Sequence, residues 1–386
     1  MYDRQHDVRK LLALVVALFA LTARTEALTE QARLSAIYDS ILEARFNQAD
    51  RQMSVACPPA PAEACQALTA VSLWWRIQLD PESRALDSML EAAALSATKS
   101  GALWTKREPR NAEAWFYFAG SHAPLVQWRI LRRERLAAAR EARTIKNALE
   151  RALALDPTLH DARFGIGLYH YYAAVAPAAL RALRWLLLMP GGNRTEGLRE
   201  MWLARDHGVL LGGEADYQLH WLYLWYEREP ARALELLRRL DARYPSNPLF
   251  LQRIAEVQRD YLHDPGASLN AWQTLLDRAA RSTPGELSSM AASQARVGIA
   301  EALIATSQYA RAIDAVTPII DAQATAPYGV LARAHFEVGR AYEFLGDRDR
   351  SIAAMQTAIA TVPDDDPREI RSRARAALVR LQSQRD

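Results

Sequence analysis

Eight histidines, two cysteines and a run of three aspartates are the residues of this chain that could bind a metal. No two histidines lie three or four residues apart, the spacing that puts two ligands on one helix face. Asp364–Asp366 lies between two prolines, which favours a solvated loop over a calcium site. We therefore expect no metal site.

Motifs that carry catalysis are also missing. The chain has no G-x-S-x-G turn, no G-x-x-x-x-G-K-[ST] phosphate loop and no C-x-x-C pair. Ser121 precedes His122, but adjacency in sequence does not make a nucleophile and its base. Gly165 and Gly167 are followed by His170 where a dinucleotide fingerprint needs a third glycine. The sequence predicts no enzyme and no cofactor, and an enzyme whose site is assembled from distant residues stays an alternative.

Cys57 and Cys65 bracket a segment with three prolines, which cannot form a helix and bends the chain. The two thiols should therefore lie close together where two helices meet. In an oxidising compartment they would form a disulfide, adding about 2–3 kcal/mol of stability. Two unpaired thiols are the alternative.

Residues 1–27 have the plan of an export signal. Arg9 and Lys10 precede the apolar run Leu11–Leu21, and Thr25 and Ala27 fit the small-residue rule for cleavage before Leu28. The run is too short to cross a bilayer about 30 Å thick. We expect an exported protein, periplasmic or secreted, with a buried first helix as the alternative.

Charge gives no general drive toward nucleic acid, because 48 basic residues face 45 acidic ones. A local basic face is nevertheless possible on one continuous helix over residues 129–151. Its glutamates favour a solvated face, but phosphate or an acidic partner could bind there. The arginines on that face, within about 100° of one another, are Arg129, Arg132, Arg133, Arg140, Arg143 and Arg151.

Beyond residue 30 the sequence is rich in Ala, Leu, Arg and Glu and shows no strand-like alternation, so we predict an all-α fold. The helices form pairs, most clearly near the C-terminus. There small residues, an aromatic, a Gly-Asp turn and a closing proline fall at offsets 0, 3, 7–8, 12, 16, 19 and 24. These residues are Gly339, Tyr342, Gly346, Asp347, Ser351, Met355, Ala358 and Pro363.

This spacing resembles the tetratricopeptide repeat, a 34-residue helix–turn–helix unit. Ala233, Ser268 and Ala312 occupy the small-residue position of earlier second helices. The segment 188–198 is also similar to a eukaryotic tetratricopeptide family of the mitochondrial outer membrane. The resemblance implies a right-handed superhelical array of antiparallel helix pairs, an α-solenoid, over residues 112–386. Residues 28–111 are expected to be a helical region outside the motif.

The resemblance further implies a non-catalytic scaffold that binds a peptide or protein segment in a concave groove. Of 32 aromatic residues, 16 lie between Trp115 and Tyr226, and they suit such a lining. We expect no nucleic-acid partner. The alternative is a membrane-associated protein using the apolar segment 173–189, although a buried helix explains that segment better. The groove positions are Phe116, Phe164, Leu168, Tyr171 and Trp225, with Tyr117, Tyr172 and Tyr226 beside them.

Overall fold

The computed structural model describes residues 28–175 and 191–383. Within these residues every regular element is a helix and no strand occurs, so the all-α prediction is confirmed. The predicted signal peptide, residues 1–27, and most of the apolar segment 173–189 lie outside the described residues.

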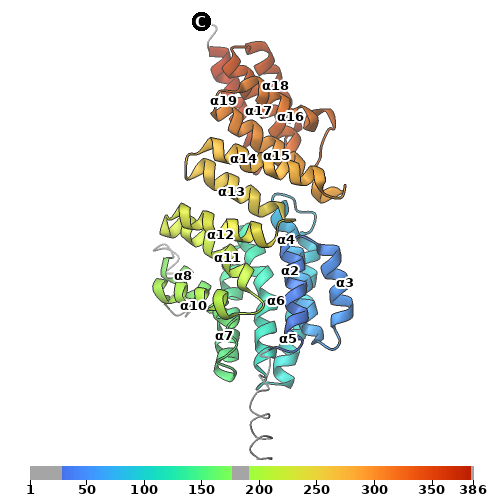
Figure 1. Cartoon of the computed structure of the whole chain (residues 1–386), viewed down its shortest axis with the longest axis vertical. Coiled ribbons are helices and arrows are strands. Elements are labelled where there is room, and N and C mark those ends of the chain that lie inside the picture. The colour runs from blue at the N-terminus through green and yellow to red at the C-terminus, as the bar shows by residue number, and fades with distance from the viewer. Residues whose placement is uncertain (1–27, 176–190, 384–386) are drawn as a thin grey trace, which may run out of the picture.

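Successive helices pack on one another in chain order and form the predicted array of helix pairs (Figure 1). The first part comprises α2 (Gln31–Leu42), α3 (Phe46–Ala56), α4 (Ala62–Leu79), α5 (Asp87–Arg107), α6 (Ala112–Leu131), α7 (Arg135–Leu155), α8 (Ala162–Val175) and α10 (Arg194–His207). The second part comprises α11 (Gly212–Leu222), the π-helical turn η1 (Tyr223–Glu227), α12 (Pro230–Arg243), α13 (Pro248–Asp260), α14 (Pro265–Arg281), α15 (Glu286–Ala305), α16 (Tyr309–Asp321), α17 (Val330–Leu345), α18 (Arg348–Thr361) and α19 (Ile370–Ser383).

Residues at the helix starts explain where several helices begin. The side chains of Asn111, Asn247 and Asp347 accept hydrogen bonds from first-turn N–H groups of α6, α13 and α18. Proline opens α12, α13 and α14, where its missing N–H costs nothing. These residues therefore set the first residue of several helices in the array.

The last complete pair, α17 and α18, crosses as its sequence predicts. Ser351 Oγ donates to the carbonyl of Gly339 at 2.8 Å, and a Cβ at Gly339 would lie 2.9 Å from Met355 Cε. Gly346 turns the chain with φ of 77°, a conformation that favours glycine. The tetratricopeptide-like geometry predicted for this unit is therefore confirmed.

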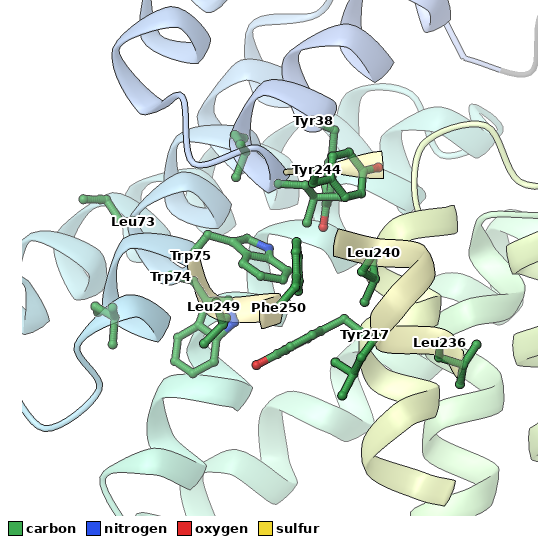
Figure 2. Close-up of a cluster of buried hydrophobic side chains, with 14 of the residues drawn as sticks. Tyr38, Leu73, Trp74, Trp75, Tyr217, Leu236, Leu240, Tyr244, Leu249 and Phe250 are labelled. Atoms are coloured by element: carbon green, nitrogen blue, oxygen red, sulfur yellow. The ribbon is translucent and has the colours of Figure 1, made fainter. Parts of the chain in front are cut away.

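The N-terminal region packs against the middle of the array, which the sequence did not predict. Trp75 of α4 lies 4.9 Å from Tyr217 of α11 and 6.0 Å from Phe250 of α13, measured between ring centroids. Figure 2 shows these rings meeting between helices that are far apart in sequence. The face of α11 that carries Tyr217 is therefore covered by the chain's own N-terminal helices.

A buried carboxylate lies beside this cluster of rings. Glu214 of α11 accepts hydrogen bonds from Tyr38 Oη and Trp75 Nε1, both at 3.1 Å, and from Gln218 Nε2 at 3.2 Å. Burial raises the pKa of the Glu214 carboxyl. The donors Tyr38 and Trp75 tie α2 and α4 to α11.

Cys57 and Cys65 form a disulfide where α3 meets α4, with their Cα atoms 6.4 Å apart. The proline-rich loop between them brings the two helix ends together. The pairing expected for an oxidising compartment is therefore present in the structure.

Candidate functional site

A row of aromatic side chains, three of them exposed and two half-buried, runs from α8 across η1 to the end of α13. Trp225 and Tyr226 are 52% and 40% exposed, although most large aromatic side chains of the described chain are buried or half-buried. Tyr226 contacts Tyr172 at 5.7 Å between centroids, Trp225 contacts Trp221 at 4.2 Å, and Trp225 Nε1 donates to Tyr261 Oη at 3.2 Å. We call Tyr172, Trp221, Trp225, Tyr226 and Tyr261 the aromatic strip.

The π-helical turn sets the geometry of this strip. Trp221 lies at the end of α11 and Trp225 lies within the π-helical turn Tyr223–Glu227. The two residues are four positions apart, and their rings pack at an interplanar angle of 31°. Arg228 ends the turn with φ of 58°, and the N–H of Glu229 bonds to the carbonyl of Tyr223 at 2.8 Å. Consecutive residues Trp225 and Tyr226 thus both reach solvent.

Charged groups fix the two ends of the strip. At one end Arg194 Nε donates to Glu227 at 2.7 Å, and Tyr171 Oη also donates to Glu227. The Arg194 hydrogen bond lowers the pKa of the Glu227 carboxyl, so the carboxylate is ionised. At the other end the Arg253 guanidinium lies 5.2 Å over the Trp221 ring. Charged side chains therefore contact the chain at both ends of the strip.

Three of the predicted groove residues do not face a groove, and that prediction is wrong for them. Phe116 and Tyr117 are buried because α4 and α5 pack on α6, where Trp104 stacks on Tyr117 with centroids 6.4 Å apart. Tyr171 is fully buried because α10 approaches α8 closely: a Cβ at Gly197 would lie 2.7 Å from the backbone nitrogen of Tyr171.

The remaining predicted positions divide into two sets. Phe164 and Leu168 of α8 are half-buried and pack against the core, so they contribute little open surface. Tyr172, Trp225 and Tyr226 belong to the aromatic strip. Trp221 and Tyr261 were missed, although the four-residue spacing of the two tryptophans could have indicated a stacked pair.

The predicted continuous basic helix is broken, and the prediction of one arginine face is wrong. Residues 132–134 form a turn between α6 and α7, where Arg133 has φ of 66°. Arg132 binds both carboxylate oxygens of Asp87 at 2.7 Å, and Arg129 pairs with Glu141 at 2.6 Å. These two side chains hold helices together and are not available to a phosphate.

Arg140 and Arg143 lie on α7 and are exposed, and Arg133 is exposed in the turn that precedes it. What is left of the basic face is Arg133 in the turn between α6 and α7, and Arg140 and Arg143 on α7.

A row of charged side chains crosses α13, α15 and α17, and sequence reasoning did not identify it. Arg259 pairs with Glu301, whose other oxygen lies 3.6 Å from Arg333 Nη2, and Arg333 Nη1 donates to Gln294 at 2.9 Å. Burial and the nearby charge of Glu301 raise the pKa of Glu337 to about 7. Since the cations and carboxylates alternate, they largely satisfy one another.

Among residues 28–175 and 191–383, no group of three His, Cys, Asp or Glu side chains is arranged to hold a metal ion. In the same ranges, no helix combines the length and apolar character that crossing a membrane requires.

No family model and no curated protein matches the sequence. Among solved structures, yeast Tom70 is similar at 11% identity, with all of this chain and 87% of that chain covered and a TM-score of 0.43. The human IFIT1 dimer with m7Gppp-AAAA is similar at 12% identity. The match covers 92% of this chain and 86% of that chain, with a TM-score of 0.45. The APC/C hetero-tetramer Cut9–Hcn1 is similar at 13% identity. The match covers 85% of this chain and 59% of that chain, with a TM-score of 0.39. These similarities concern the helical fold alone.

Proposed function

We propose that this protein is a non-catalytic interaction scaffold that binds a protein segment across the aromatic strip. The observation that carries the proposal is the adjacent exposure of Trp225 and Tyr226 on the π-helical turn. Large aromatic side chains give much contact area for little loss of rotamer freedom, which is why they dominate the energetics of protein interfaces. The site differs from the groove predicted from sequence, since it uses the rims of three helices.

The strip favours an extended segment over a small ligand. Its rings form two groups that are joined through the consecutive residues Trp225 and Tyr226. Tyr172 contacts Tyr226 in one group, and Trp221 and Tyr261 contact Trp225 in the other. Indole and phenol groups also offer polar edges to a peptide backbone.

To test this proposal, Trp225→Ala combined with Tyr226→Ala should weaken binding of peptides selected on the wild-type protein by display. Removing two interface aromatics should cost about 2–4 kcal/mol, or 30-fold or more in Kd. The measurement is a binding titration of each selected peptide.

Phe344→Ala is the matched control, because Phe344 is 56% exposed but lies on α17, stacked on Tyr309 and outside the strip. Equal affinities of the wild type and the double variant would overturn the proposal.

We propose in addition that the protein works in a cell envelope or secretory compartment. The disulfide supports this, because such bonds persist where the environment is oxidising. Fractionation of the native host, with the mass of the mature chain, tests it. A start at Leu28 in an exported fraction is the expected result, and an uncleaved chain with free thiols in the cytosol would contradict it.

A further inference from the structure

A cleft of about 400 Å³ opens between α15 and the end of α16, away from the aromatic strip. Its volume falls in the range of ligand sites in proteins, about 300–1,000 Å³. One wall is a single face of α15, formed by residues at spacings of three and four. The other wall is the last turn of α16 and the non-helical segment 324–326. The α15 residues are Glu286, Ser289, Ala292, Ser293 and Arg296.

Two opposite charges stand at the ends of this wall. In the part of the chain that the structure describes, neither Glu286 nor Arg296 forms an ion pair, and the polar contact of Arg296 is with the carbonyl of Ala315 at 3.4 Å. Other half-buried arginines, such as Arg259 and Arg278, are paired with carboxylates. The cleft therefore has one unpaired cation and one unpaired anion, ten residues apart on one helix.

The middle of the cleft is suited to a peptide backbone. Ala292, Ala322 and Ala324 are small, so a main chain can approach closely, and Ile319 supplies an apolar floor. Within the described residues the hydroxyls of Ser289 and Ser293 make no hydrogen bond, and neither does the N–H of Thr325. The free N–H of Thr325 can donate to the carbonyl of a bound peptide, as main-chain donors do when a peptide adds to a protein.

The length of the cleft fixes the pattern of the ligand. Ten residues of α-helix span about 15 Å, which an extended peptide crosses in about four or five residues. We propose that this cleft binds an extended segment of a partner protein in which an acidic and a basic side chain lie about four residues apart. The acidic side chain pairs with Arg296 and the basic side chain with Glu286.

The test uses four labelled heptapeptides with amidated ends that differ at two positions. Gly-Glu-Ser-Ala-Thr-Lys-Gly has the proposed pattern, and the others carry two glutamates, two lysines or two glutamines at those positions. Kd values come from microscale thermophoresis with the full chain. The mixed-charge peptide should bind about fivefold more tightly than the diglutamine peptide, because it forms two exposed ion pairs that together contribute about 1 kcal/mol. Equal Kd values, or no binding of any peptide, would overturn the proposal.

A charge reversal makes the test specific. Glu286→Arg gives the cleft two cations, so the preference should switch from the mixed-charge peptide to the diglutamate peptide by a similar factor. Ser289→Trp should weaken all four peptides by filling the cleft while both charges remain. Arg311→Gln is the control, since Arg311 is exposed on α16 outside the cleft. An unchanged preference in Glu286→Arg, with the helical circular dichroism intact, would rule out the assignment.

Discussion

The fold raises the pKa of the Glu337 carboxyl into the neutral range. Its side chain is buried in α17, pairs with Arg340 at 2.8 Å, and has a pKa raised to about 7 by burial and by Glu301. A carboxyl with a raised folded-state pKa holds its proton more tightly than in the unfolded chain. Its contribution to stability is therefore complete below the ordinary value of 4.5 and is lost as pH rises toward 7.

We therefore expect Glu337→Gln to flatten the pH dependence of stability. Near pH 4.5 the variant should resemble the wild type, and at pH 8 it should be more stable by about 3 kcal/mol, which is 1.36 kcal/mol for each unit of the shift. Urea unfolding at a series of pH values measures this. Glu343→Gln, on the same helix and paired with Arg380 at the surface, should keep the wild-type slope. A wild-type slope in Glu337→Gln would contradict the assignment.

At the scale of single residues, the sequence showed which aromatic side chains could form a binding surface, but it did not show which of them are buried. Trp225, Tyr226 and Tyr172 were predicted as surface residues of a binding site and do line the aromatic strip. Phe116 and Tyr117 are also aromatic and were predicted to lie at or beside the same groove, yet both are buried. What covers them is α4 and α5, and no local pattern around α6 reports where those helices pack.

At the scale of helices, close crossings depend on glycine at particular positions. Gly298 of α15 faces Trp272 of α14 so closely that an added Cβ would lie 2.2 Å from the indole ring. Gly120 of α6 has open space, since nothing lies within 4 Å of such a Cβ. The same substitution should therefore act in opposite directions at these two helical glycines.

We expect Gly298→Ala to destabilise the protein by about 1–3 kcal/mol, because the rigid indole cannot yield without moving a helix. Gly120→Ala should instead stabilise it by about 0.5–1 kcal/mol, since alanine is the better helix former. Thermal unfolding of both variants beside the wild type measures the difference. Stabilisation by both would show that α14 and α15 do not cross as closely as described.

Helix pairing was predictable where the repeat spacing is regular. Where the spacing is irregular, the predicted helix boundaries were wrong. Gly339 and Ser351 identified the α17–α18 crossing correctly from their separation alone. The break at residues 132–134 was missed because it contains neither glycine nor proline, and the turn instead uses Arg133 with positive φ. Arginine rarely adopts that conformation, so composition gave no warning.

At the scale of the molecule, this array departs from a simple solenoid. In such a solenoid each repeat contacts only its neighbours, and stability is a sum of local terms. Here Asp39 accepts a hydrogen bond from Tyr244 Oη at 2.7 Å, and Asp80 accepts two from the backbone N–H of Tyr328 at 2.9 and 3.1 Å. These contacts join segments more than 200 residues apart, so α2 and α4 should unfold together with the helices they cover.

Asn247 provides a direct test, because it joins two distant elements. It is buried, its Nδ2 donates to the carbonyl of Leu42 at 2.7 Å, and its Oδ1 caps α13 at the N–H of Leu249. Asn247→Ala should cost about 2–3 kcal/mol, for the lost cap and the unsatisfied carbonyl. Hydrogen exchange should then accelerate in α2 and α4 as much as in α13, although the substitution lies in the loop before α13.

Asn193→Ala separates a lost cap from a lost long-range contact. Asn193 caps α10 by accepting from the N–H of Glu196 at 3.1 Å, and it is exposed. Its removal should cost about 1 kcal/mol and accelerate exchange in α10 while α2 stays protected. If Asn247→Ala also left α2 protected, the N-terminal helices would form an independent unit that merely rests on the array. Faster exchange in α2 with Asn247→Ala alone would show that α2 unfolds together with α13, as the hydrogen bond from Asn247 to the carbonyl of Leu42 predicts.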